Sequence, residues 1–137
     1  MSNGGSGAPH SFPWVGADTR GVPVILSYGS FNHASQHHAA FANPALNLPA
    51  QPYRAVLETL SQPDVVYENG QRRGAPPRKG HELYCRWVGF AGQYVLVPVK
   101  ILSAPQVVEG YHAPVGARLA LTLFTDDTKP SRPIIWP

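Results

Sequence analysis

The sequence predicts a single α+β domain in which two N-terminal helices pack on an antiparallel sheet of about four strands. The length of 137 residues and a hydrophobic content of 43% suit one compact domain with a real core. Helical spacing of apolar residues is confined to the first half of the chain, and strand-like segments follow it. The 15 prolines and 13 glycines predict long, turn-rich connections rather than a helical bundle.

Residues 1–29 are predicted to form a flexible leader and an extended arm. The opening MSNGGSGAPHSFPW lacks a basic segment followed by an apolar core, so it does not resemble a secretory signal. Its composition is that of a linker or of a disordered terminus. Residues 21–30 have a short apolar centre between Gly and Pro, which favours an edge strand or an extended arm.

Two helices are expected next. Ser30 or Asn32 can cap a helix through residues 33–41, which Pro44 then stops. The segment 51–61 carries a proline in its first turn and repeats apolar residues at helical spacing, so it predicts a second, amphipathic helix.

The rest of the chain predicts strands, loops and a tail. Pro98 lies within the most apolar strand, where it needs a bulge or a position without a ladder hydrogen bond. Together these elements predict an α+β domain that spans residues 30–127, followed by an extended Pro-rich tail at residues 128–137. The predicted strands are residues 64–69, 81–90, 93–102 and 117–127, with loops at 69–80 and 103–116.

Composition excludes several classes of protein. Cys85 is the only cysteine, so the chain has no internal disulfide and no Cys-rich zinc site. The apolar runs are too short to cross a bilayer, which predicts no membrane partner. The net charge of +3 and a pI near 9.2 allow a polyanionic partner without requiring one.

The order of these segments resembles the barnase/EndoU/colicin/RelE-like nuclease superfamily, especially its phage and polymorphic-toxin members. The resemblance covers residues 30–127. It is carried by QPDVV at 62–66, by VPVKIL at 97–102, and by Thr122 two residues ahead of an aromatic residue. The long loop at 103–116 departs from the family pattern.

The resemblance implies a metal-independent endoribonuclease toxin domain without a cofactor. Such a domain cleaves RNA, for example tRNA, when the ribose 2′-OH attacks the adjacent phosphate and leaves a 2′,3′-cyclic phosphate. It also implies a monomer that an acidic immunity protein neutralises. The domain would be delivered as part of a larger secreted or phage-encoded antibacterial protein and would act in the cytoplasm of the target cell.

The catalytic candidates are chosen because this chemistry needs an acid, a base and positive charge at the phosphate. Histidine suits the acid and base roles. His33 and His37 match the position of the helical histidine in the resembling domains. The alternative for each is a solvent-exposed or hydrogen-bonded helix histidine without a catalytic role. Their i, i+4 spacing is that of a zinc pair, but no third ligand is obvious nearby. The remaining catalytic candidates are His81, Arg86 and Thr122. His81 begins a predicted strand after the basic loop, and the sequence does not decide which face of that strand lines a cleft. The alternatives for Arg86 and Thr122 are a buried ion pair and a β-favouring residue.

The substrate-binding candidates are cations and one aromatic residue. Four cations fall within eight residues of one polar loop. They suit a phosphate backbone, but the cations of such a loop are often simply solvated. Lys100 ends an apolar strand, where its side chain can meet a phosphate or extend into solvent. Tyr84 is a base-stacking candidate, although most tyrosines in such strands are core or cross-strand residues. The four loop cations are Arg72, Arg73, Arg78 and Lys79.

Two other functional classes remain open. An NAD-consuming toxin similar to ADP-ribosyltransferases would need a cleft built around a glutamate. A non-enzymatic phage structural or interaction module would use the Pro-rich ends to contact its neighbours. A cleft that holds a histidine together with Arg or Lys would favour the ribonuclease over the interaction module.

Overall fold

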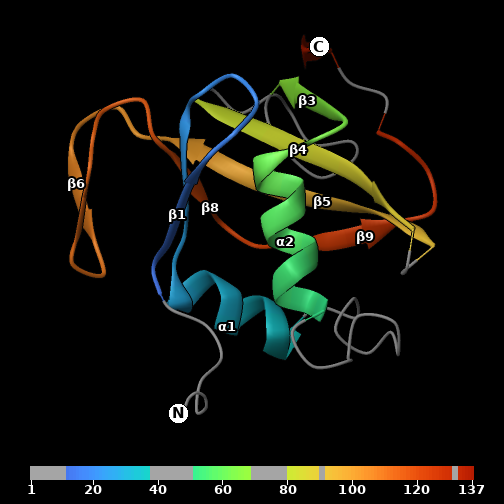
Figure 1. Ribbon diagram of the computed structural model, residues 1–137, viewed down its shortest axis with the longest axis horizontal. Coiled ribbons are helices and arrows are strands. Elements are labelled where there is room, and N and C mark those ends of the chain that lie inside the picture. The colour runs from blue at the N-terminus through green and yellow to red at the C-terminus, as the bar shows by residue number, and fades with distance from the viewer. Residues whose placement is uncertain (1–11, 38–50, 69–79, 90–91, 131–132) are drawn as a thin grey trace.

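The computed structural model describes residues 12–37, 51–68, 80–89, 92–130 and 133–137, and Figure 1 shows how their elements are arranged. They form a mixed α+β structure that is mostly sheet, which confirms the predicted fold class. In chain order the elements are β1 (Trp14–Ala17), β2 (Pro23–Leu26), α1 (Tyr28–His37), α2 (Gln51–Ser61), β3 (Val65–Glu68), β4 (His81–Val88), β5 (Gln93–Ile101), β6 (Gln106–Val108), β7 (Tyr111–Ala113), β8 (Arg118–Ala120), β9 (Phe124–Asp126) and β10 (Ile134–Trp136).

The sheet is larger than the sequence predicts. It has eight strands in the order β1-β2-β8-β5-β4-β3-β10, with β9 also paired to β5. The prediction of about four strands beneath N-terminal helices is therefore wrong, because β1 and β2 precede both helices. These extra strands have three or four residues each, too few for an alternating pattern to stand out.

The turn between β1 and β2 explains why residues 14–26 of the predicted leader and arm join the sheet. The Asp18 carboxylate accepts backbone hydrogen bonds from Arg20 at 2.8 Å and from Val22 at 3.0 Å. The Asp18 amide in turn donates to the Val22 carbonyl at 3.0 Å, and Gly21 supplies the positive φ of 79°. This closed turn places β2 between β1 and β8, the latter a parallel neighbour.

Pro98 of β5 interrupts the pairing with the predicted last strand, residues 117–127. That segment therefore forms two short strands, β8 and β9. The Leu121 amide donates to the Pro98 carbonyl at 2.9 Å, so the backbone of Pro98 faces the side of β5 where β8 and β9 pair. A proline nitrogen has no hydrogen to donate on that side. The ladder is interrupted there, with β8 pairing to one half of β5 and β9 to the other.

The core lies on both faces of the sheet. We call the face that carries Tyr84 and Val97 the helix face, because these residues pack with Val56 and Leu60 of α2. Figure 1 shows α2 in front of β4 and β5, and α2 also contacts β1, so the sheet curls around this helix. The opposite face, here the far face, buries two further clusters, which are centred on Leu83, Cys85 and Leu96 and on Ile25, Leu102 and Val108.

Helix α1 begins earlier than predicted because of a contact distant in sequence. Ser27 caps the helix, with its hydroxyl accepting from the Ser30 amide at 3.1 Å. The Glu109 carboxylate adds hydrogen bonds from the amides of Tyr28 at 2.8 Å and Gly29 at 3.1 Å. Glu109 lies in the tight turn of the β6–β7 hairpin, so the predicted loop 103–116 in fact holds a hairpin that supports α1.

The predicted tail also contributes to the sheet. Residues 134–136 form β10, which pairs with β3 through an irregular register at the sheet edge. The Glu68 amide donates to the Pro133 carbonyl at 2.9 Å and extends this contact. Ile134 and Ile135 remain exposed on this edge.

Candidate functional site

The alternation of β4 decides which predicted residues can act together. Glu82, Tyr84 and Arg86 point to the helix face, since Tyr84 packs in the cluster that contains α2. His81 lies on the far face with Leu83 and Cys85. His81 and Arg86, both proposed from sequence as catalytic, therefore lie on opposite faces of one strand.

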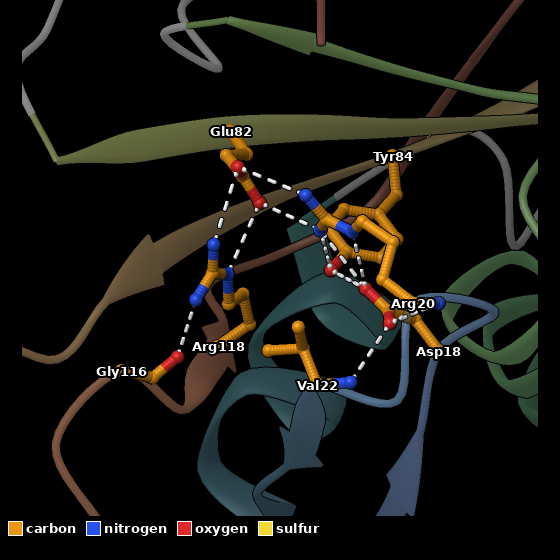
Figure 2. A network of polar contacts seen from close by, with 7 residues as sticks. All are labelled: Asp18, Arg20, Val22, Glu82, Tyr84, Gly116 and Arg118. Atoms are coloured by element: carbon orange, nitrogen blue, oxygen red, sulfur yellow. Dashed lines mark hydrogen bonds and ion pairs between the residues drawn. The ribbon is translucent and has the colours of Figure 1, made fainter. Parts of the chain in front are cut away.

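The helix face holds a buried polar network, which we call the Glu82 network (Figure 2). The carboxylate of Glu82, 3% exposed, accepts from Arg20 Nη2 at 3.0 Å and from Arg118 Nε at 3.1 Å. Arg20 Nη2 also reaches Asp18 Oδ2 at 2.9 Å and Tyr84 Oη at 2.8 Å. The hydroxyl of Tyr84 donates to Asp18 Oδ2 at 2.6 Å, which closes the network.

The Glu82 network joins three parts of the chain that are distant in sequence. Arg20 comes from the β1–β2 turn, Glu82 and Tyr84 from β4, and Arg118 from β8. Two carboxylates face two guanidinium groups, so the formal charges cancel inside the protein. Buried charges are tolerated when they are paired in this way. With its charges balanced and its donors and acceptors engaged, the network is a structural tie between strands.

Electrostatics within the network favour ionised carboxylates. Burial by itself would raise the pKa of Glu82, but hydrogen bonds from Arg20 and Arg118 outweigh it and hold the pKa below its ordinary value. The pKa of Asp18 is likewise lowered, because hydrogen bonds from Tyr84, Val22 and Arg20 outweigh the effect of burial. Burial raises the pKa of Tyr84, and its hydrogen bond to Asp18 adds to the rise.

These shifts predict a loss of stability in acid. The pKa values of Asp18 and Glu82 in the folded state lie below the ordinary values of 3.8 and 4.5. Their contribution is therefore complete above about pH 4.5 and is lost as the pH falls through the folded-state values. Urea midpoints measured from pH 7 to pH 3 should fall steeply at the acid end, and Glu82→Gln should flatten that fall. An unchanged acid slope in Glu82→Gln would contradict this assignment.

The structure decides between the alternatives that the sequence left open for Tyr84 and Arg86. Tyr84 is fully buried, so its ring offers no surface on which a base could stack. Arg86 Nη1 donates to the Gln62 carbonyl at 2.7 Å and thereby caps the C-terminal end of α2. Its guanidinium also lies 3.8 Å from carboxylate oxygens of Glu58 and Asp64.

His81 and Lys100 are brought together by the register of the sheet. They are directly opposite each other where β4 pairs with β5. Opposed residues in an antiparallel pair have Cβ atoms about 4.5–5.5 Å apart. Lys100 is exposed and His81 is partly exposed. The chain reaches His81 directly from the segment that carries Arg72, Arg73, Arg78 and Lys79, which lies outside the described residues.

The other catalytic candidates do not join this pair. His33 is exposed on α1, which lies apart from the start of β4 in Figure 1. The side chain of His37 lies outside the described residues. Thr122 follows β8 near the interruption at Pro98, and its hydroxyl is buried without a hydrogen-bond partner among the described residues.

Sequence reasoning missed Asp18, Arg20 and Arg118 altogether. Asp18 and Arg20 lie in the segment that was predicted to be a leader, Arg118 lies in the last predicted strand, and no local pattern links any of them to β4. One signal was available, because strand alternation places Glu82 on the same face as Tyr84 and Val88, and a carboxylate on a buried face requires a partner. The sequence could not say which of its 11 basic side chains would provide that partner.

Comparisons with known proteins add no family. No family model matches the chain, and no curated protein or solved structure matches it either.

Among the described residues, no group of three or more His, Cys, Asp or Glu side chains could hold a metal ion. In the same part of the chain, no helix is long and apolar enough to cross a membrane.

Proposed function

We propose that this chain is a metal-independent endoribonuclease whose reacting phosphate lies against His81 and Lys100. The observation that carries the proposal is the direct pairing of these two residues between β4 and β5. An imidazole and an ammonium group side by side supply two of the groups that this chemistry needs, a base and a positive charge at the phosphate. Both residues retain some exposure to solvent, as a site for a polymer substrate requires.

In this proposal His81 acts as the general base. Its neutral imidazole removes the proton of a ribose 2′-OH, whose oxygen then attacks the adjacent phosphorus. The bond from phosphorus to the 5′-oxygen breaks, the leaving 5′-oxygen takes up a proton from solvent, and a 2′,3′-cyclic phosphate remains. The ammonium group of Lys100 stabilises the charge that develops on the non-bridging phosphate oxygens.

The basic segment before β4 serves binding in this proposal. Arg72, Arg73, Arg78 and Lys79 precede His81 by 2–9 residues in the sequence. Cations at this distance along the chain suit contacts to phosphates that flank the cleaved one. We further propose the toxin role, with an acidic immunity protein that covers these cations.

The test is cleavage of RNA by the purified protein in the presence of EDTA, followed by end-group analysis. We expect EDTA-resistant cleavage that leaves a cyclic phosphate, and a rate about 10²–10⁴ times lower in His81→Ala. Lys100→Ala should lose about 10²-fold or more, as expected when one charge-stabilising donor is removed. An oligoribonucleotide with a 2′-deoxy sugar at the cleaved position should stay intact.

The matched control is His112→Ala, because His112 is an exposed histidine on the β6–β7 hairpin. That variant should cleave at the full rate. Intact RNA with folded wild-type protein would refute the nuclease proposal. Full activity in His81→Ala together with loss in His33→Ala or His37→Ala would keep the nuclease and move its base to α1.

The same samples address the NAD-consuming alternative. The carboxylate of Glu82 is engaged by two arginines, whereas Glu58 lines an open pocket. Release of nicotinamide from NAD by a sample that leaves RNA intact would favour that alternative. Absence of both reactions would favour the interaction module.

A further inference from the structure

An open pocket of about 450 Å³ lies where α2, β1 and β4 meet. Pockets that bind small molecules commonly enclose about 300–1,000 Å³, and the volume of this open pocket falls within that range. Arg86, on the helix face of β4, is one of its lining residues, so the pocket is on the opposite face from His81. We call it the Trp14 pocket. Its lining residues are Trp14, Leu57, Glu58, Ser61, Gln62 and Arg86.

The aromatic wall of the pocket depends on a glycine two residues away. The indole of Trp14 lies so close over Gly16 that a Cβ atom at position 16 would be 2.6 Å from the ring. Real side chains do not tolerate that approach, so only glycine permits this position of the indole. Trp14 also packs against the core cluster of the helix face, which restricts its motion. The ring is therefore held in place before any ligand arrives.

The polar wall presents a donor and an acceptor side by side. Arg86 is held by its bond to the Gln62 carbonyl, and Glu58 is held by Arg54 at 2.7 Å. Arg86 Nε and Glu58 Oε1 are 3.8 Å apart, too far for a hydrogen bond. Both side chains are partly exposed, at 29% and 35%, but the Nε atom of Arg86 is itself buried, so a ligand meets the outer atoms of the guanidinium group. A ligand edge with a neighbouring acceptor and donor would complement this pair.

The charges of the lining residues favour a neutral ligand. One cation and one anion line the pocket, so neither a phosphate nor an ammonium ion meets a net opposite charge. An aromatic wall and a fixed donor–acceptor pair together suit a flat, polar heterocycle. Every nucleobase has a π-face and an edge with adjacent donors and acceptors. We propose that the Trp14 pocket binds a nucleobase, stacked on Trp14, with its polar edge toward Arg86 and Glu58.

The proposal stands apart from the proposed cleavage site. A base can reach the pocket in a free nucleoside or as an unpaired base of RNA, and the chemistry of recognition is the same. The test is therefore a titration of ¹⁵N-labelled protein with adenosine, guanosine, cytidine and uridine, and with ribose 5-phosphate. Short oligoribonucleotides form a second arm, because tighter binding than the nucleoside would identify RNA as the source.

We expect nucleosides, but not ribose 5-phosphate, to shift the indole N–H of Trp14 and the amides of Ser61 and Gln62. Trp14→Ala and Gly16→Ala should each weaken binding about 10-fold or more, the scale of one base–aromatic stacking contact. Trp14→Phe keeps an aromatic ring and should lose less, which separates stacking from a folding defect. Trp87→Ala, at an exposed tryptophan of the far face, should bind as the wild type does.

Three outcomes would overturn the proposal. The first is the absence of shifts at the pocket with millimolar nucleosides. The second is equal binding by ribose 5-phosphate. The third is a preference for an arginine or lysine side-chain analogue, which would mark the pocket as a protein-docking site. Each outcome can be read whether or not the protein cleaves RNA, so a failure here is distinct from a failure of the nuclease proposal.

Discussion

Glu82→Gln is expected to lower the free energy of unfolding by about 3–5 kcal/mol, the usual result of removing one partner from a buried ion pair. The substitution leaves Arg20 and Arg118 without their common carboxylate. The glutamine amide also places a donor against the donors of two guanidinium groups. Urea unfolding at pH 7, followed by circular dichroism, measures the loss directly.

Glu68→Gln is the matched control for this prediction. Glu68 is directly opposite Glu82 in the β3–β4 pair, but its side chain is exposed. The same substitution there should change the stability by less than about 0.5 kcal/mol, as exposed positions usually do. Equal and small losses at both positions would mean that the Glu82 network does not tie the strands together.

Leu60→Ala should destabilise the protein by about 2–5 kcal/mol. Leu60 is fully buried where α2 packs on the helix face of the sheet. Truncation removes apolar contact and leaves a cavity between the helix and the sheet. Thermal unfolding and urea unfolding should both report the loss.

Leu57→Ala provides the comparison within the same helix. It makes the same chemical change with the same effect on helix propensity, but Leu57 is only partly buried. The loss of stability in Leu57→Ala should be clearly smaller than in Leu60→Ala, because folding removes less apolar area from water at position 57. A larger cost at Leu57 than at Leu60 would contradict the observed packing of α2.

The local patterns of the sequence predicted the elements that have enough length to show a period. The second helix was expected at residues 51–61 and lies at Gln51–Ser61. Strands β3, β4 and β5 lie within the predicted segments 64–69, 81–90 and 93–102. The need for a bulge or an unbonded position at Pro98 was also foreseen, and the ladder is interrupted there.

The first helix shows where local signals were insufficient. The sequence offered Ser30 and Asn32 as caps, but Ser27 caps the helix. The carboxylate that completes this helix start belongs to Glu109, more than 80 residues from Ser27 in the chain. A cap supplied from such a distance leaves no trace in the sequence around α1.

The sequence by itself determined the α+β class, the amphipathic α2 and the alternation that sends Glu82 and His81 to opposite faces of β4. These features depend on periods of 3.6 and two residues, which any stretch of the chain carries within itself. Only the tertiary structure decided that β1 and β2 join the sheet, that Arg20 and Arg118 pair with Glu82, and that His81 faces Lys100. Strand order and register bring such residues together, and both depend on contacts between segments far apart in the chain.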